Sequence, residues 1–524
     1  MKERLADDWL TRINERGYDV AFCQVLLSKG KRVLRAGHSP VEHGKDVIAT
    51  SADLSDVWAY QLKTGDITLK DVQKLQGQMG MLVETRPMFP GLPPIFSYHP
   101  VLVTTGEFNE PAMSLIKELN ESWRVRNLPA LEVINGRALL ADLLELSHDF
   151  WPVATPDVRT LRSLYLVEGK GDFDPKGFGE LMMRLMQSSV AAKNVSRQAA
   201  AANLFASYLL GPFYENTDHW SVFRGWTICA AAIAWAGESS ISDKSDWHEP
   251  FLLAREAAQT ALASLANEAD DENNFRAGAM ELDDYTRVRN TTVMAAVAAS
   301  VLIANSSGKK NDTDVTLARI KSFAAQGRFI YWGEGAFSQH LVLFWFLKCA
   351  SEDGAAKDFL LNTIQLVTDR QQRDSTNPLP NPYQSPDDCL TKLLSETEEP
   401  TMKSAVESGN LYPLIILCAR HQLRSELTAL WPKITNVFMS WLLVEKPIDV
   451  LQWDCDTGTE HSQQFGEQSW ADLIGAANHE NRDRLPSILW DDPAFAIMFM
   501  LTFQHRMLTS LVKRLDDVLL PRAK

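Results

Sequence analysis

The sequence has few cysteines, and those it has lie far apart. Six occur among 524 residues: Cys23, Cys229, Cys349, Cys389, Cys418 and Cys455. None belongs to a CxxC pair or lies near a paired histidine, which argues against a structural zinc motif or a disulfide framework. The pattern predicts reduced thiols and a cytoplasmic protein.

A long apolar stretch is also absent. The opening "MKERLADDWL" is charged from residue 2 and does not resemble a secretory signal. The longest apolar runs, "WTICAAAIAWAG" and "VMAAVAASVLIA", have about a dozen residues, fewer than the roughly 20 that cross a bilayer as a helix. We therefore expect buried helices and no membrane association.

Positive charge is scarce as well. The formal net charge is −15, so nucleic acid would have to bind at a local patch. Residues 1–150 carry 17 Lys/Arg against 20 Asp/Glu, a net charge of −3, and the rest carries −12. Within the first part, "SKGKRVLR" has four cations and no acid: Lys29, Lys31, Arg32 and Arg35. This cluster is either a contact for nucleic-acid phosphates or a solvated loop and strand edge.

The secondary-structure pattern of residues 1–152 predicts an α/β domain. Apolar residues at helical spacing predict a helix over 3–16, ending at Gly17. Strand-like segments follow at 18–27, 31–36, 45–51, 57–65, 99–106 and 130–134, and helical patterns at 68–79, 109–123 and 136–150. The order of helix, several strands and then alternating helices and strands predicts a mixed sheet.

Residues 153–524 have a different character. Long helical patterns rich in Ala and Leu predominate, strand-like alternation nearly disappears, and no repeat of 30–50 residues is evident. We expect an all-α domain, either one helical array or two bundles divided near the proline-rich segment 373–388.

Polar residues at the ends of two predicted strands suggest metal chemistry. Alternate residues of a strand share a face, so Gln61 and Lys63 project together, and a short connection can place Asp46 beside Gln61. Carboxylate and amide oxygens suit Mg²⁺ or Mn²⁺. Lys63 could orient or help activate a water and offset charge on a phosphate. The same side chains could instead solvate an exposed sheet face. Candidates for a further acidic ligand are Asp7, Asp8 and Glu42.

These segments together resemble a known family. "GKDVIA" followed by "YQLK" resembles the PD-(D/E)xK nuclease core in its Mrr-like restriction endonuclease form, where glutamine commonly replaces the second acid. "VLVTTGEFNEPA" is similar to the family's Thr-Thr-(Gly/Ser)-x-Phe segment, and "LEVINGRALLADLL" to its closing strand and helix. The resemblance covers residues 1–147. It departs at "SPVEHGKD", where the family often has a glycine-rich approach to the aspartate.

The resemblance implies a Mg²⁺-dependent endonuclease acting on DNA, with RNA not excluded. The implied catalytic residues are Asp46, Gln61 and Lys63, of which Asp46 and Gln61 hold the metal. Many Mrr-like nucleases are bacterial anti-phage effectors fused to a sensing or assembling module, the role implied for residues 153–524.

The chain has no GxxxxGK[ST] motif, so an ATPase or sensor subunit would be a separate protein partner. The Ala-rich helices also suit homo-oligomers. The alternative is a degenerate nuclease-like module within a helical interaction or scaffold protein.

Overall fold

The computed structural model divides into two compact units, Met1–Ala257 and Ala258–Lys524. The residues that it describes are 2–14, 17–36, 45–87, 92–146, 154–166, 173–192, 195–240, 244–270, 284–306, 314–325, 329–332, 334–370, 407–453, 459–464, 468–479, 482–504 and 507–520.

The first unit begins with an α/β region built on a five-stranded mixed sheet. Its strands are β1 (Arg32–Ala36), β2 (Val47–Thr50), β3 (Asp56–Lys63), β4 (Ser97–Thr104) and β5 (Glu132–Ile134). They lie in the sheet in the order of the sequence. The first three pair antiparallel, whereas β3, β4 and β5 run parallel. The predicted α/β fold with a mixed sheet is confirmed.

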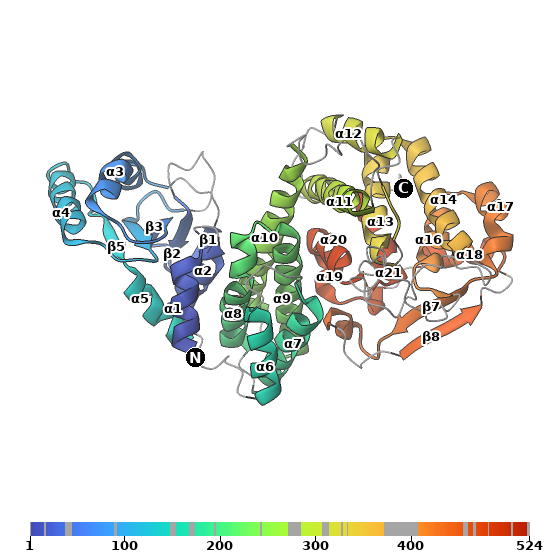
Figure 1. The fold of residues 1–524 in the computed structure, drawn as a ribbon, viewed down its shortest axis with the longest axis horizontal. Helices are drawn as coiled ribbons and strands as arrows, with labels where there is room; N and C mark the ends of the chain where they lie inside the picture. Colours follow the sequence, from blue (N-terminus) through green and yellow to red (C-terminus); the bar gives the residue numbers. More distant parts are fainter. Residues whose placement is uncertain are drawn as a thin grey trace. The chain divides into compact units, whose positions relative to one another are not determined.

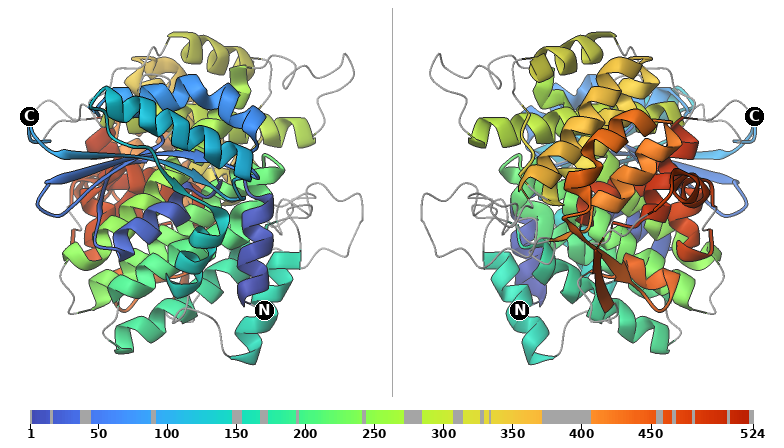
Figure 2. Two further views of the ribbon diagram at one scale, coloured as in Figure 1. Left: turned by 90° about the vertical axis from the view of Figure 1, so that its left-hand side faces the viewer. Right: turned by 90° about the vertical axis from the view of Figure 1, so that its right-hand side faces the viewer.

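Helices cover both faces of this sheet. They are α1 (Lys2–Arg12), α2 (Asp19–Ser28), α3 (Leu69–Glu84), α4 (Glu110–Val125) and α5 (Gly136–Leu146). Figures 1 and 2 show α3 and α4 on one face and α1 and α2 on the other. Parallel strands need crossover connections, which α3 and α4 supply. Between these two helices and the sheet lies a core that includes Ala59, Val72, Leu82, Leu102 and Ile116.

The prediction of an extended segment at residues 18–27 was wrong, because this segment forms α2. Its apolar run lacks a clear period, and periodicity alone cannot separate a buried strand from a buried helix. Seven of the ten residues of α2 are buried, since the helix packs against the sheet and also against α8 (Val195–Glu215).

Two glycines allow close packing at the carboxyl end of β4. A Cβ on Gly106 would lie 2.3 Å from the carbonyl carbon of Gly65, and a Cβ on Gly136 would lie 2.0 Å from the carbonyl oxygen of Thr105. The Gly136 amide donates to the Gly106 carbonyl at 2.7 Å. The backbones of three connections therefore meet where β3 ends.

Gly136→Ala is expected to lower the free energy of unfolding by about 2–3 kcal/mol, because the new methyl group would overlap backbone atoms. Gly77→Ala is the matched control: Gly77 lies within α3 with open space around it, so alanine should stabilise the helix by about 0.5–1 kcal/mol. Urea denaturation of both variants measures the difference. Equal stability of the two variants would contradict the packing described here.

The first unit continues beyond the sheet into helices. These are α6 (Thr155–Leu166), α7 (Pro175–Ala192), α8, α9 (His219–Ser239) and the N-terminal part of α10 (Lys244–Asn267). Trp9 of α1 joins the two parts: its indole N–H donates to the Ser207 carbonyl at 2.9 Å, and its ring meets Tyr208 edge to face at 4.9 Å. The predicted division after residue 152 coincides with the change from sheet to helices, and as a domain boundary it stays a prediction.

The second unit is mostly helical, as predicted. After the C-terminal part of α10, its helices are α11 (Asp284–Ser306), α12 (Asp314–Ala325), α13 (Phe337–Cys349), α14 (Asp353–Arg370), α16 (Leu411–Arg420), α17 (Arg424–Ile434), α18 (Trp470–Asn478), α19 (Ser487–Asp491), α20 (Pro493–Thr502) and α21 (Thr509–Leu519). Short 3₁₀ helices are η3 (Glu268–Asp270), η5 (Glu334–Ala336), η6 (Pro447–Leu451) and η7 (Arg482–Arg484).

A small sheet in this unit was not predicted. It consists of β6 (Glu407–Ser408), β7 (Phe438–Leu443) and β8 (Thr459–Gln464), with β7 in the middle. The sequence of β7 is mostly apolar and that of β8 is polar, so neither shows the alternation of apolar and polar residues that predicts a strand. The predicted division of the helices at 373–388 lies outside the described residues.

α11 contains the run "VMAAVAASVLIA", predicted to be a buried helix. Among the described helices it is the one long and apolar enough to cross a bilayer, judged by length and composition alone. However, 61% of its apolar window is buried inside the protein, and Met294, Ala298 and Leu302 have no exposed surface. α11 thus packs as a core helix of the second unit.

Candidate active site

Asp46 lies at the start of β2 and contacts the neighbouring strand. Its amide N–H donates to the carbonyl of Tyr60 at 2.9 Å, and its Oδ2 accepts the Leu62 amide N–H at 2.7 Å. The antiparallel pairing of β2 with β3 therefore holds this carboxylate against the peptide that joins Gln61 to Leu62.

Gln61 is a polar residue in the interior of the region, with only 2% of its surface exposed. Its side-chain Nε2 donates to Oε1 of Gln78 on α3 at 2.7 Å. Its Oε1 is buried and has no hydrogen-bond partner among the described residues. An unsatisfied buried acceptor costs about 1–3 kcal/mol, so such an atom calls for an explanation.

Gln78 was not predicted from the sequence. Leu75 and Leu82 lie one helical turn before and after it, so Gln78 borders the stripe of α3 that packs on the core. A polar residue bordering an apolar stripe was the signal that could have found it.

Lys63, the last residue of β3, is partly exposed. Its carbonyl oxygen accepts from the Tyr18 hydroxyl at 2.9 Å and from the Thr105 amide at 3.2 Å. In the next turn, the Thr105 hydroxyl accepts from the Gly65 amide at 3.0 Å, and the Thr104 hydroxyl donates to the Gly65 carbonyl at 2.5 Å. The Thr-Thr-Gly segment thus fixes the end of β3 through its backbone.

Lys45 directly precedes Asp46 and is 4% exposed. Burial lowers the pKa of its amine, because removal from water disfavours the charged form. Lys45 therefore gives up its proton more readily than an exposed lysine does.

The proposed acidic ligands of α1 have surroundings of their own. Asp8 accepts a hydrogen bond from the Tyr165 hydroxyl and forms an ion pair with Arg12 at 3.0 Å. Asp7 is exposed on α1. Glu42 lies outside the described residues. Within the described ranges there is no group of three or more His, Cys, Asp or Glu side chains that could hold a metal.

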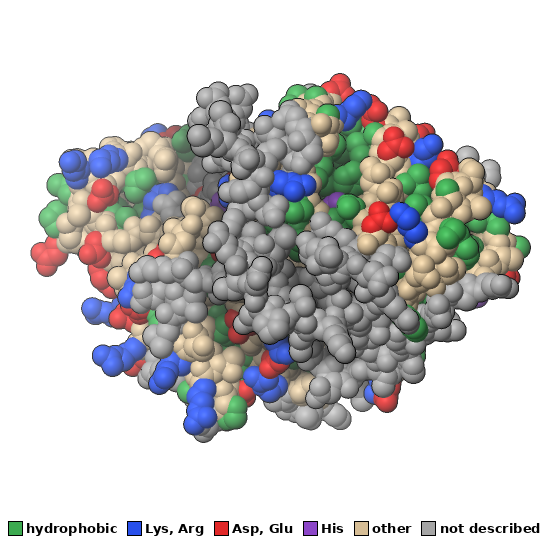
Figure 3. Space-filling view, turned by 45° about the vertical axis from the view of Figure 1, so that its right-hand side comes forward, with side chains coloured by type: hydrophobic (Ala, Val, Ile, Leu, Met, Phe, Trp, Pro, Cys, Tyr) green, Lys and Arg blue, Asp and Glu red, His purple; other side chains and the backbone are tan. Residues whose placement is uncertain are grey.

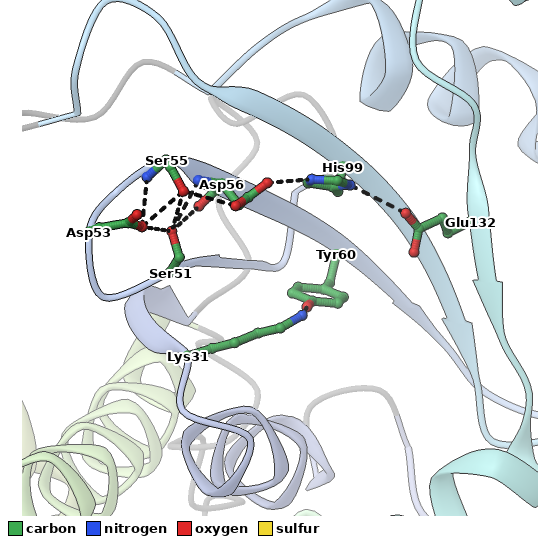
Figure 4. A network of polar contacts seen from close by, with 8 residues as sticks. All are labelled: Lys31, Ser51, Asp53, Ser55, Asp56, Tyr60, His99 and Glu132. Atoms are coloured by element: carbon green, nitrogen blue, oxygen red, sulfur yellow. Dashed lines mark hydrogen bonds and ion pairs between the residues drawn. The ribbon is translucent and has the colours of Figure 1, made fainter.

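Two of the four predicted phosphate-binding cations have partners within the first unit. Lys29 forms an ion pair with Asp142 at 2.6 Å. The Lys31 ammonium lies 3.7 Å from the ring centre of Trp58 and donates to the Tyr60 hydroxyl at 2.7 Å, as Figure 4 shows for Tyr60. Burial is the main cause that lowers the pKa of Lys31 to about 8.

The other two predicted phosphate-binding cations are Arg32 and Arg35. Arg32 is exposed and has no ion pair among the described residues, and the side chain of Arg35 lies outside what the structure describes. On the face in Figure 3, Lys and Arg side chains are interspersed with Asp and Glu over the described surface. No long cationic track is visible there.

A second polar network ties the parallel strands together (Figure 4). His99 of β4 lies between two carboxylates, at 3.0 Å from Asp56 of β3 and 3.4 Å from Glu132 of β5. Its ring stacks on Trp58 with centroids 5.1 Å apart. These contacts stabilise the pairing of three neighbouring strands.

No family model matches the chain, and no similar protein was found among curated proteins or solved structures. The class of protein is therefore defined by its fold: an N-terminal α/β region with a mixed five-stranded sheet, followed by a large helical region.

Proposed function

We propose that residues 1–152 form a Mg²⁺- or Mn²⁺-dependent DNA endonuclease similar to the Mrr-like PD-(D/E)xK nucleases. The observation that carries the proposal is the Asp46 carboxylate held against β3 next to Gln61, whose buried amide oxygen has no hydrogen-bond partner among the described residues. The order of helices and strands agrees with the same family.

Two of the residues present, Asp46 and Gln61, suit a hard divalent cation, and a third ligand is still needed. Asp46 and Gln61 would hold it through oxygen atoms, and a bound ion would satisfy the lone acceptor of Gln61. When bound, the ion would polarise a phosphate oxygen and lower the pKa of a coordinated water. Asp7, Asp8 and Glu42 stay the candidates for a third ligand, of which Asp8 already contacts Tyr165 and Arg12.

Lys63 would act beside this pair. Its backbone is fixed by Tyr18 and Thr105, so its side chain starts from a defined position. Its ammonium would orient the attacking water and offset charge on the phosphate, while Gln78 would orient the Gln61 amide through the 2.7 Å hydrogen bond. An RNA-directed nuclease would use the same residues.

The helical remainder, residues 153–524, would regulate or assemble the nuclease. In this proposal the protein is a cytoplasmic anti-phage effector that works with a separate ATPase or sensor subunit or as a homo-oligomer. The support is the resemblance of residues 1–147 together with a helical region that contains no nucleotide-binding loop motif.

The second candidate is a nuclease-like module that has lost catalysis and serves a helical scaffold. The internal partners of Lys29 and Lys31 favour it, because they reduce the free cations available to a phosphate backbone. So does the small number of acidic ligands among the described residues.

Metal binding separates the two candidates. We expect the full chain to bind Mn²⁺, and Asp46→Asn to weaken that binding about tenfold or more, because it removes the one charged ligand. Asparagine retains an oxygen that can accept from Leu62, so the fold should persist. Asp53→Asn is the control: Asp53 is exposed in the β2–β3 loop and likewise accepts a backbone N–H.

The measurement is Mn²⁺ titration by electron paramagnetic resonance, with plasmid cleavage in Mg²⁺ with and without EDTA as a second readout. Absence of Mn²⁺ binding in the natural chain, or equal binding by Asp46→Asn, would favour the scaffold.

A further inference from the structure

The second unit contains a cavity that the proposed nuclease chemistry does not use. Its volume is about 950 Å³, near the upper end of the range of small-molecule sites. It is lined by the first turn of α16, the end of β7, the C-terminal half of α18 and the N-terminus of α21. One wall is apolar and includes Met439, Leu442, Val444, Pro447 and Leu508.

Two cations also line the cavity. Lys513 is only 6% exposed, and its ammonium donates to the carbonyls of Ala476 at 3.0 Å and His479 at 2.5 Å. A lysine ammonium has three N–H donors, so one remains beyond these two bonds. Arg484 is exposed at the rim. Neither cation forms an ion pair with a carboxylate among the described residues.

The helix that carries Lys513 adds to the positive potential. α21 begins in the cavity wall with Thr509 and Ser510, and its N-cap residue, Leu508, supplies no side-chain hydrogen bond. The first N–H groups of a helix and its macrodipole attract anions. Glu445 is the sole acidic residue among the described lining residues. Among the described lining residues, the cations Lys513 and Arg484 therefore outnumber the one acid.

The pKa of Lys513 agrees with this balance. Burial lowers it first and the nearby Arg420 and Arg484 lower it further, whereas Asp517 raises it. An anion in the cavity would offset both causes, because it would favour the charged ammonium.

We propose that this cavity binds a nucleotide. The phosphates would lie against Lys513, Arg484 and the start of α21, and the base and sugar against the apolar wall. Two cations and a helix N-terminus match the multiple negative charges of a phosphate ester better than the single charge of a carboxylate. This inference does not depend on the proposed nuclease activity.

Gly475 provides a way to fill the cavity without disturbing the fold. It lies within α18, lines the cavity, and has no atom within 4 Å of the position that a Cβ would occupy. Gly475→Phe should extend a ring into the cavity, whereas Gly475→Ala adds one methyl group and should favour the helix.

Isothermal titration of the full chain tests the proposal, with AMP, ATP, inorganic pyrophosphate and octanoate as probes. We expect AMP and ATP to bind, pyrophosphate to bind more weakly than ATP, and octanoate not to bind. Arg484→Ala should weaken ATP binding about tenfold, the magnitude of one charge-assisted hydrogen bond. Gly475→Phe should abolish binding, and Gly475→Ala should retain it.

Circular dichroism of each variant verifies that it is folded. The proposal is overturned by the absence of binding of AMP and ATP at about millimolar concentration, where an interaction is worth only about 4 kcal/mol. It is also overturned if Gly475→Phe and Arg484→Ala both bind like the natural chain, or if octanoate binds as tightly as ATP.

Discussion

Lys63→Ala is expected to lower metal-dependent plasmid cleavage by about 100-fold or more, the usual contribution of a positioned acid–base group. Mn²⁺ affinity should stay within a few-fold of that of the natural chain, since the ligands Asp46 and Gln61 are unchanged. The fold should also persist. The contacts with Tyr18 and Thr105 use the carbonyl of Lys63, which alanine retains.

Lys74→Ala is the matched control. Lys74 lies on α3 with 66% of its side chain exposed, and its ion pair with Asp71 is 3.9 Å long. Initial rates of supercoiled plasmid cleavage in Mg²⁺ should therefore match those of the natural chain. Cleavage that survives Lys63→Ala, or that falls equally in both variants, would remove Lys63 from the chemistry.

Arg420→Met is expected to destabilise the second unit by about 3–5 kcal/mol, because it leaves a buried carboxylate without its cation. Asp516 is 1% exposed and accepts hydrogen bonds from Arg420 at 2.7 Å, His421 at 3.0 Å and Trp345 at 3.1 Å. Arg420 also donates to the Ala477 carbonyl at 2.7 Å and pairs with Asp517. One guanidinium thus connects α16, α18 and α21.

The loss should depend on pH. Burial would raise the pKa of Asp516, but hydrogen bonds and charges from His421 and Arg420 outweigh it, and the pKa lies below its usual value. In the natural chain this carboxylate therefore stabilises the fold above its unfolded pKa, near 4, and stops doing so as pH falls through the lower folded pKa. Without Arg420, burial still raises the pKa of Asp516 and His421 still lowers it. The deficit of the variant should then shrink as the pH falls and Asp516 takes up a proton.

Hydrogen–deuterium exchange of peptides from α16 and α21 at pH 7 and pH 5, corrected for intrinsic exchange, measures both effects. Arg424→Met is the control, because Arg424 is exposed at the start of α17. Equal protection of Arg420→Met and Arg424→Met at pH 7 would show that the buried ion pair does not hold these helices together.

The sequence predicted most of the sheet because its signals are local. Alternating apolar residues at β3 and β4, and the Asn109 cap of α4, act within a few residues. α2 was missed because its environment is created by elements far along the chain. A segment buried by the sheet on one side and by α8 on another has no amphipathic pattern of its own.

The candidate site was predictable to a similar degree. Strand pairing explains why Asp46 meets the backbone near Gln61. The contacts of Lys31 with Trp58 and Tyr60 join the residue before β1 to β3, a strand that is not the neighbour of β1 in the sheet, and no spacing rule predicts them. The cavity of the second unit depends on segments from Gly409 to Lys513 that come together only after folding.

The contact of Trp9 with α8 has a consequence for how the α/β region could be isolated or controlled. A fragment ending at residue 152 would leave Trp9, now 3% exposed, and much of α2 facing water, which favours aggregation. A protein or ligand that displaced α8 would also expose α2, whose preceding residue, Tyr18, donates to the carbonyl of Lys63. The helices after the sheet thus cover the segment that contacts the last residue of β3.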